Sequence, residues 1–384
     1  MRNIHHESFK IGMLGGGQLG RMSLQEAYNL NLHISILDPS SDAPCKALTD
    51  DFVQGDFKDF DTVYQFGQDK EVMTIEFEDV NADALQKLEE EGVKVFPQPQ
   101  ILKLIQDKGL QKQFYQTHGL PTSPFELIED KNEIANSKLN FPLFQKLRTS
   151  GYDGYGVQKI NSTNSLDQAM DGPSVLEEGV DLQTELSVII ARNESGEVKH
   201  FPLVELAFNP KANMVEFLFS PASVSKSIEA KAYALATKLM NKLEMVGLLA
   251  VEMFLNTDGE LLINEIAPRA HNSGHHSIEG NYTSQFGQHL RAILNLPLGN
   301  TDIQNAAVMV NLLGEEGHTG EAIYQGMEDA LKLEGVYPHL YGKNQVKPFR
   351  KMGHITVIDK DVKKAKVKAR KVKGMVKVVS KESL

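Results

Sequence analysis

Two glutamates in a predicted hairpin are well placed for chemistry. Glu252 and Glu265 each lie in an apolar, strand-like run, LLAVEMFL and ELLINEIA, and an Asp-Gly turn joins the two runs. Pairing of the runs would point both carboxylates at a shared face, with Asn264 beside the second. Buried carboxylates need a cation or donors, and oxygen ligands of this kind suit Mg²⁺, which also binds substrate phosphates. Two solvated edge glutamates are an equally good interpretation of the pair alone.

A polar run directly follows the hairpin. Residues 269–276 read RAHNSGHH, a segment rich in groups that bind anions. The hairpin and this run together predict a metal–phosphate site beside an anion-binding loop.

A first glycine-rich segment lies near the start of the chain. Gly15, Gly17 and Gly20 follow a predicted strand and open a predicted helix, and Asp38 comes eighteen positions after Gly20. This spacing matches a dinucleotide-binding fingerprint and makes a dinucleotide-dependent oxidoreductase an alternative. The same glycines also serve other anions or a tight strand–helix turn.

A second glycine-rich segment, residues 149–156 (TSGYDGYG), follows the strand that ends at Lys146. Its backbone N–H groups could close over an anion, with Lys146 as a neutralising charge. The segment lacks the Gly-Lys-Ser/Thr of a P-loop, and a surface hairpin is the alternative.

An apolar strand runs into a polar hinge at residues 175–180 (VLEEGV), and Glu185 follows. Such a hinge can present backbone groups to a purine edge, and a nearby carboxylate can accept from ribose hydroxyls.

The elements that would position these residues follow from hydrophobic periodicity. Strands at 9–14, 33–37 and 71–77, with helices at 21–30 and 82–91, predict a doubly wound α/β domain in the first hundred residues. A helix is expected over 100–119, and another over 227–243. Further strands are expected at 141–146, 156–159, 174–178, 186–191, 199–207, 215–220, 306–312 and 353–358.

Composition excludes several classes of protein. The 384 residues are 41% hydrophobic and 24% charged with a net charge of −11, which predicts a soluble globular chain and argues against nucleic-acid binding. The basic run at 363–371 has apolar residues at helical spacing, so its lysines should solvate one helix face. A single cysteine, Cys45, and the lack of a signal or membrane-spanning segment make the cytoplasm the expected compartment.

The order of these motifs resembles the ATP-grasp superfamily. Five runs are closer still to the 5-(carboxyamino)imidazole ribonucleotide synthase (PurK) family: residues 15–22 (GGGQLGRM), 76–78 (EFE), 150–154 (SGYDG), 264–275 (NEIAPRAHNSGH) and 350–354 (RKMGH). The resemblance spans about residues 10–379. It implies a mixed α/β and α+β fold: a Rossmann-like pre-ATP-grasp domain (1–100), an ATP-grasp domain (101–298) with a lid (about 122–182), and a small C-terminal domain (299–384).

The resemblance also implies an activity. Enzymes of this family use ATP and bicarbonate to carboxylate 5-aminoimidazole ribonucleotide in purine synthesis, through carboxyphosphate. Glu252 and Glu265 would hold one or two Mg²⁺ ions. The residues implied for ATP are Lys108, Lys146, Gly151, Tyr152, Asp153, Gly154, Tyr155, Gly156, Val157, Glu177, Glu178, Gly179, Val180, Glu185, Asn264 and Glu265.

Substrate and catalytic roles carry over in the same way. Gln18, Leu19, Glu76, Asn272, Ser273, Lys343 and Arg350 would bind the ribonucleotide, the last two at its 5′-phosphate, and Arg269, His271, Tyr152 and Asp153 would be catalytic. A homodimer is implied as well. The chain departs from the family at Tyr155 and Val157, where many members have a basic residue and Gln, and at Lys108, which is often Arg. The segment 208–215 looks longer than usual.

Four functions therefore stand as alternatives: this ligase, a related purine ligase using formate or another acid, an oxidoreductase using the first glycine loop, and a non-catalytic nucleotide-binding protein. The presence of both Glu252 and Glu265 argues against the last, since a sensor needs no two-carboxylate metal site.

Overall fold

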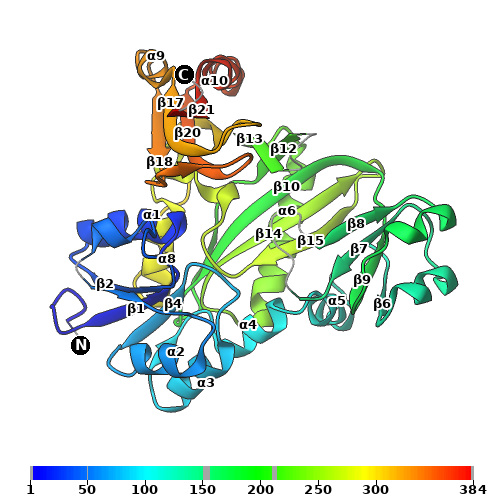
Figure 1. Cartoon of the computed structure of the whole chain (residues 1–384), viewed down its shortest axis with the longest axis horizontal. Helices are drawn as coiled ribbons and strands as arrows, with labels where there is room; N and C mark the ends of the chain where they lie inside the picture. The colour runs from blue at the N-terminus through cyan, green and yellow to red at the C-terminus, as the bar shows by residue number, and fades with distance from the viewer. Residues whose placement is uncertain (1–2, 50, 150–155, 210–213, 382–384) are drawn as a thin grey trace.

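The computed structural model describes residues 3–49, 51–149, 156–209 and 214–381. Its strands form sheets of five, nine, three and four strands. In Figure 1 the nine-stranded sheet runs through the centre, with the N-terminal domain, the lid and the C-terminal region around it.

The N-terminal sheet is parallel, in the order β3-β2-β1-β4-β5. Its strands are β1 (Lys10–Leu14), β2 (His33–Asp38), β3 (Phe52–Gln54), β4 (Val72–Ile75) and β5 (Lys94–Val95), and its helices are α1 (Gln18–Asn29), α2 (Phe60–Gly67) and α3 (Ala82–Glu90). The strand order reverses between β1 and β4, where open α/β sheets bind ligands beyond the carboxyl ends of their strands. The first glycine loop and Glu76 lie at this place.

The helix predicted over residues 100–119 was wrong as one element. The chain forms α4 (Pro99–Ile105) and α5 (Lys108–Thr117) instead. Asp107 caps α5, because its side chain accepts hydrogen bonds from the backbone N–H groups of Gly109 and Leu110. A side-chain cap of this kind starts a new helix and lets the chain change direction.

The lid is an antiparallel sheet in the order β6-β9-β7-β8. Its strands are β6 (Phe125–Ile128), β7 (Leu143–Leu147), β8 (Val157–Ile160) and β9 (Ser174–Glu178), and two 3₁₀ turns, Lys131–Asn136 and Thr163–Gln168, cover it. Ile128, Leu143 and Leu176 are among the residues of its own small core. The β7–β8 connection carries the second glycine loop, of which 150–155 lie outside the described residues.

The central sheet begins with the predicted hairpin. It contains β10 (Leu182–Arg192), β11 (Val198–His200), β12 (Val204–Asn209), β13 (Met214–Ser220), β14 (Gly247–Asn256) and β15 (Leu261–Ala267). The single strand predicted over 199–207 was wrong, since β11 and β12 separate around Pro202.

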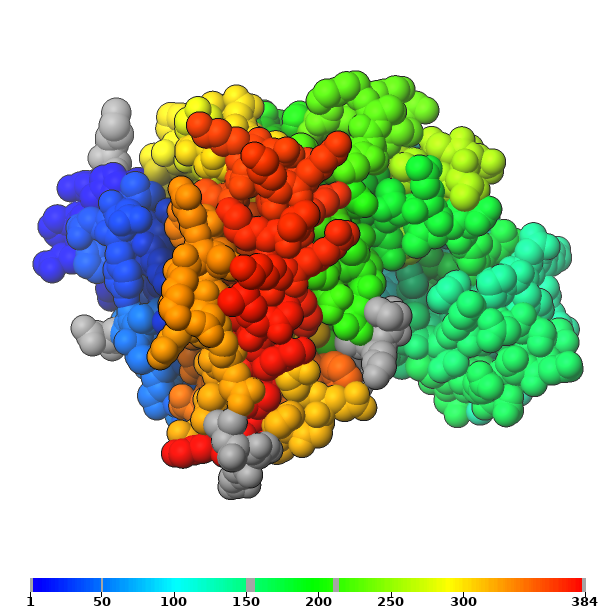
Figure 2. Space-filling model, turned by 90° about the horizontal axis from the view of Figure 1, so that it is seen from above, coloured from blue at the N-terminus to red at the C-terminus, as the bar shows by residue number. Residues whose placement is uncertain are grey.

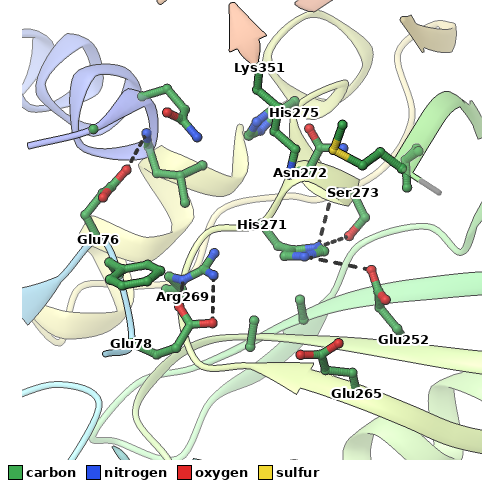
Figure 3. Close-up of a pocket in the computed structure, with 18 of the residues that line it drawn as sticks. Glu76, Glu78, Glu252, Glu265, Arg269, His271, Asn272, Ser273, His275 and Lys351 are labelled. Atoms are coloured by element: carbon green, nitrogen blue, oxygen red, sulfur yellow. Dashed lines mark hydrogen bonds and ion pairs between the residues drawn. The ribbon is translucent and has the colours of Figure 1, made fainter. Parts of the chain in front are cut away.

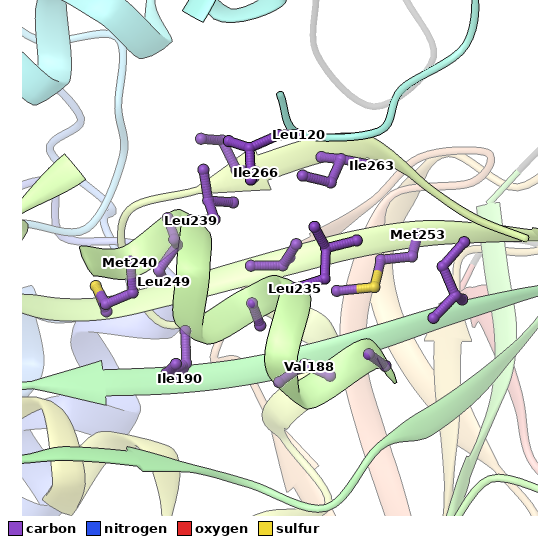
Figure 4. Close-up of a cluster of buried hydrophobic side chains, with 14 of the residues drawn as sticks. Leu120, Val188, Ile190, Leu235, Leu239, Met240, Leu249, Met253, Ile263 and Ile266 are labelled. Atoms are coloured by element: carbon purple, nitrogen blue, oxygen red, sulfur yellow. The ribbon is translucent and has the colours of Figure 1, made fainter. Parts of the chain in front are cut away.

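Helix α6 (Lys226–Leu243) covers one face of this sheet. Figure 4 shows Leu235, Leu239 and Met240 of the helix facing strand side chains such as Val188 and Leu249. The alternation along β10 directs Leu186, Val188 and Ile190 into this core. The opposite face is left for the site.

The C-terminal region extends the same sheet. Strands β16 (Ala306–Leu313), β20 (Lys351–Asp359) and β18 (Val336–Leu340) follow β13 in order, so hydrogen bonding continues across the predicted limit at residue 298. A small sheet of β17 (Gly320–Gln325), β19 (Gln345–Val346) and β21 (Lys377–Ser380) lies beside α9 (Met327–Leu331) and α10 (Val362–Met375).

The basic helix α10 behaves as its spacing predicts. Ala365, Ala369 and Val372 are buried, while most of its lysines remain at least partly exposed. In Figure 2 this red segment crosses the middle of the visible face. Across the described ranges we find no helix long and apolar enough to span a membrane.

Candidate active site

Glu252 and Glu265 pair directly across β14 and β15, as predicted. The Glu252 side chain is 17% exposed and that of Glu265 54% exposed. Burial, and then the negative charges of Glu265 and Glu185, raise the pKa of Glu252 to about 8. A carboxylate whose charge is disfavoured in this way is stabilised by a neighbouring cation.

The donor set fits Mg²⁺. Within the part of the chain that the structure describes, no cluster of three or more His, Cys, Asp or Glu side chains is arranged to hold a metal. A site with two protein carboxylates suits Mg²⁺, because this ion keeps waters and takes further oxygens from substrate phosphates.

A cavity of about 320 Å³ lies between the lid and the hairpin. Of the residues predicted for ATP, its lining includes Lys108, Lys146, Val157, Glu177, Glu178, Val180, Glu185, Asn264 and Glu265. Two other described candidates, Gly156 and Gly179, are not in this lining but neighbour residues that are. Gly151, Tyr152, Asp153, Gly154 and Tyr155 lie outside the described residues.

Glu177 is the centre of a buried charge cluster. Its carboxylate lies 2.9 Å from the Nζ of Lys112 and 2.9 Å from the Nζ of Lys146. Burial favours the neutral acid, but the two lysines outweigh it and hold the pKa of Glu177 below its ordinary value. Burial lowers the pKa of Lys112 to about 8, against the pull of Glu177. The Glu177 side chain thus joins lid strands β9 and β7 to helix α5.

Lys146 also contacts the hairpin. Its Nζ donates to the Oδ1 of Asn264 at 3.0 Å, and Lys108 forms an ion pair with Glu265 at 3.5 Å. Burial works against the charge of Lys146, but Glu177 raises its pKa above the ordinary value. Two cations therefore lie beside the carboxylates, where nucleotide phosphates would need them.

A second cavity, of about 430 Å³, lies between the N-terminal domain, the hairpin and the C-terminal region. The predicted residues in its lining are Gln18, Leu19, Glu76, Arg269, His271, Asn272 and Ser273. Phe208, Glu252 and Glu265 line both cavities. The two spaces therefore meet at the carboxylate pair.

The first glycine loop is closed by its own acidic residues. Asp38 accepts from the N–H of Gly16 at 2.7 Å and from that of Ser40 at 2.8 Å. Glu76 accepts from the N–H of Leu19, in the first turn of α1, at 3.0 Å. In a dinucleotide site the acidic residue would instead bind a ribose hydroxyl, so this arrangement disfavours the oxidoreductase alternative.

Arg269 is held by Glu78, which lies in the 76–78 motif but was given no role from the sequence. Its guanidinium pairs with Glu78 through two nitrogens, Nε and Nη2, the second at 2.9 Å (Figure 3). Although burial favours the neutral acid, Arg269 holds the pKa of Glu78 below its ordinary value. The i, i+2 spacing of Glu76 and Glu78 was the available signal, since residues two apart at a strand end share a side.

Lys343 and Arg350 do not appear in the described lining of either cavity. The Nζ of Lys343 donates to the backbone oxygen of Lys351 at 2.8 Å, and Arg350 donates to that of Gln345 at 2.6 Å. Lys351 lines the second cavity instead, above Asn272 in Figure 3. A phosphate role for Lys343 and Arg350 stays a prediction, and Lys351 is a cation that sequence reasoning did not single out.

No sequence pattern marked several other cavity-lining residues as part of a site. Lys112 and Phe208 sit in ordinary helical and strand patterns, and only the fold shows that they face the site. His275 lines the second cavity but is buried, with its Nδ1 bonded to Gln285 and its ring against Phe286 and His354.

Comparison with protein families agrees with this geometry. The ribonucleotide synthetase preATP-grasp domain matches residues 8–106, the ATP-grasp domain 113–286, and the phosphoribosylaminoimidazole carboxylase C-terminal domain 307–368. The protein is therefore an ATP-grasp enzyme, an ATP-dependent ligase.

Comparison with individual proteins identifies the family within the ATP-grasp enzymes. The chain is 39% identical to an N5-carboxyaminoimidazole ribonucleotide synthase of Bacillus subtilis, over 92% of this chain and 93% of the relative. A Vigna aconitifolia protein named phosphoribosylaminoimidazole carboxylase, chloroplastic, is 37% identical, and the match covers 64% of its length. The chain belongs to the N5-carboxyaminoimidazole ribonucleotide synthase (PurK) family, as its motifs predict.

Solved structures agree. A synthetase of this name from Thermotoga maritima has a TM-score of 0.90 and 41% identity, covering 97% of this chain and 100% of that one. A synthase from Aspergillus clavatus in complex with ADP and 5-aminoimidazole ribonucleotide has a TM-score of 0.88 and 34% identity, covering 96% and 98%. The predicted fold class is thus confirmed.

Proposed function

We propose that this protein carboxylates 5-aminoimidazole ribonucleotide with bicarbonate and ATP, forming N5-carboxyaminoimidazole ribonucleotide, ADP and phosphate in purine synthesis. The observation that carries the proposal is the meeting of two cavities at Glu252 and Glu265. One has the lysines and hinge of a nucleotide site, and the other has the arginine and polar loop of an anionic substrate site. ADP and 5-aminoimidazole ribonucleotide, the two ligands of the Aspergillus complex, match these two kinds of site.

On the nucleotide side, Lys108 and Lys146 would bind phosphates, the backbone of Glu178 and Val180 the purine, and Glu185 the ribose. Burial raises the pKa of Glu185 to about 7, against the pull of Lys146. Near neutral pH this carboxyl group is therefore protonated in a fraction of the molecules, where it can donate a hydrogen bond as well as accept one. Glu252 and Glu265 would hold one or two Mg²⁺ ions, which when bound would neutralise charge on the ATP phosphates.

The chemistry proposed has two balanced steps. A bicarbonate oxygen attacks the γ-phosphorus of ATP and ADP leaves, giving carboxyphosphate. The exocyclic amine of the ribonucleotide then attacks the carboxyl carbon, inorganic phosphate leaves, and the amine loses a proton. Because the two cavities meet at Glu252 and Glu265, the acyl phosphate formed in one could reach the amine in the other without crossing bulk water, which would hydrolyse it.

On the substrate side, Arg269 would bind and orient an anion, because Glu78 fixes the direction of its guanidinium. Gln18, Leu19, Glu76, Asn272 and Ser273 would surround the ribonucleotide. Tyr152 and Asp153 of the glycine loop complete the proposed catalytic set, and closure of the 151–157 loop would exclude water.

We also propose the predicted organisation: domains 1–100, 101–298 and 299–384, a lid at about 122–182, a homodimer, and a cytoplasmic location. The separate core of the lid supports its treatment as a unit. The buried thiol of Cys45 suits a reducing compartment.

The test is ADP release from purified protein with Mg²⁺, ATP, bicarbonate and aminoimidazole ribonucleotide, each omitted in turn. We expect full release only with all four present. Release that does not respond to the ribonucleotide would overturn the proposal. Replacement of bicarbonate by formate tests the related ligase, and reduction of NAD by a purine intermediate would revive the oxidoreductase.

A further inference from the structure

The hydrogen bonds around His271 define which ring nitrogen carries its hydrogen. The Nδ1 atom lies 3.3 Å from the backbone nitrogen of Ser273 and 2.9 Å from the Oγ of the same residue. A backbone N–H can only donate, and it cannot rotate away as a hydroxyl can. A hydrogen on Nδ1 would point at the hydrogen of this N–H group. Nδ1 is therefore the acceptor, and the hydrogen of the neutral ring is on Nε2.

The opposite side of the ring faces the site. His271 lines the substrate cavity, and its Nε2 lies 3.8 Å from the Oε1 of Glu252 (Figure 3). An Nε2–H group in this place is directed to the point where the two cavities meet. The carboxyl oxygens of a bicarbonate-derived intermediate would have to pass this point.

A second serine extends the chain of hydrogen bonds. The Oγ of Ser187 lies 2.8 Å from the Oγ of Ser273. Ser187 is fully buried on β10, opposite Glu252 in the strand register, on the same face of the sheet as Ile189 and Ala191. A buried hydroxyl needs a hydrogen-bond partner, and the partner that the structure gives Ser187 is Ser273. With Nδ1 as acceptor, Ser273 donates to His271 and Ser187 can donate to Ser273.

We infer that His271 acts as a hydrogen-bond donor through Nε2 to an oxygen of the carboxyl intermediate or the departing phosphate, and that Ser187 is a positioning residue for it. The ring does not accept the proton of the substrate amine in this state, because Nε2 already carries a hydrogen and Nδ1 faces Ser273. The catalytic part of this inference rests on the proposed function. The tautomer and the role of Ser187 in holding it do not.

The first test is nitrogen-15 NMR of the wild-type chain labelled at histidine, without substrates. The His271 signals are identified by their loss in His271→Gln. We expect a protonated Nε2 and an unprotonated Nδ1, and we expect Ser187→Ala to broaden or mix the two signals. A protonated Nδ1 in the neutral ring would overturn the inference whatever the activity of the protein.

The second test is kinetic and requires an active wild type, so it fails separately from the proposed function. His271→Ala should lower kcat by about a hundredfold, the loss typical of a removed oxyanion donor. His271→Gln keeps an N–H donor without a basic nitrogen and should be at least about tenfold more active than the alanine variant. Equal activity of the two variants would contradict a donor role.

Ser187 is tested by its own pair of variants. Ser187→Ala should lower kcat about three- to tenfold with little change in the KM for ATP, as expected for one lost hydrogen bond. Ser187→Thr keeps the hydroxyl and should restore most of the loss. An unchanged kcat in Ser187→Ala, with unchanged His271 signals, would overturn the positioning role.

Discussion

Glu177 lies between two lysines from different elements, Lys112 of α5 and Lys146 of β7. Each charge is costly to bury, and the three are tolerated because each has an oppositely charged partner within 3 Å. The cluster fixes Lys146 beside Asn264, at the end of the nucleotide cavity near the carboxylate pair. The buried ion cluster thus holds Lys146 in position for the proposed nucleotide phosphates.

Glu177→Gln should destabilise the protein by about 3–5 kcal/mol at pH 7, because it leaves two buried ammonium groups without a counter-charge. Urea unfolding at pH 7 measures this change. The folded-state pKa of Glu177 is lowered, so its stabilisation is present above about pH 4.3 and is lost as the pH falls through the folded value.

The loss of stability in the variant should therefore shrink in acid. An equal loss at pH 7 and at pH 3.5 would contradict an ionised Glu177 in the folded state. Glu178→Gln is the matched control, because Glu178 neighbours Glu177 but its carboxylate accepts hydrogen bonds from Asn140 near the surface instead of from the buried lysines.

Glu265→Gln tests the metal role. It replaces a proposed Mg²⁺ ligand by a near-isostere, so turnover should fall by at least about a thousandfold, while the thermal midpoint should change little because the side chain is half exposed. Steady-state ADP release and a melting curve measure the two quantities. Activity within a few-fold of wild type would refute the role.

Asp258→Asn is the control for this variant. It removes one negative charge from the exposed turn of the same hairpin, and Asn-Gly keeps the turn chemistry. Its turnover should match the wild type.

At the residue scale, the sequence predicted those site residues whose neighbours in the chain form a distinctive pattern. The glutamate pair and the 269–273 run were identifiable, because charged groups interrupt apolar strands or follow them directly. Glu78 and Lys351 lie in named motifs but were given no role, and Lys112 was not noted, since each becomes a site residue only through contact with an element far away in the chain. Arg269 and Glu78, for example, are 191 positions apart.

At the scale of elements, the β1–α1 loop depends on its glycines for space. A Cβ on Gly17 would lie 2.5 Å from a carboxylate oxygen of Glu76, the group that accepts from Leu19 at the start of α1. Gly17→Ala should therefore displace Glu76 and raise the KM for the ribonucleotide by about tenfold or more, with the affinity for ATP unchanged. Initial-rate kinetics separate the two constants.

Gly374→Ala is the matched substitution in α10, where nothing lies within 4 Å of the added carbon. It should leave both constants unchanged. If Gly17→Ala weakened ATP and ribonucleotide equally, the assignment of this loop to the ribonucleotide would be wrong.

Periodicity predicted most of the elements around the site, including β9 at Ser174–Glu178 without error. It failed where a single side chain or a proline interrupts an otherwise regular pattern, as at Asp107 and Pro202. The continuation of the central sheet into β16 was also hidden, because apolar alternation shows that a strand is half buried and does not name its partner.

At the scale of the whole molecule, four segments distant in sequence surround one site. The lid supplies Lys146 and Glu177, the hairpin supplies the carboxylates, and the N-terminal domain with the C-terminal strand β20 closes the second cavity. Motif order along the chain predicted that these parts belong to one enzyme. The common wall formed by Phe208, Glu252 and Glu265 required the fold, since it is a property of how the sheets pack.

Because the two cavities meet at the carboxylate pair, ATP cleavage should be coupled to carboxylation of the ribonucleotide. The decisive measurement follows carbon-13 bicarbonate in a reaction with ATP, Mg²⁺ and aminoimidazole ribonucleotide, together with the ADP formed. We predict one labelled carboxyl group on the amine of the ribonucleotide for each ADP released, and no label in the product when ATP is omitted. ADP release without label on the ribonucleotide, or label on another atom, would contradict this account.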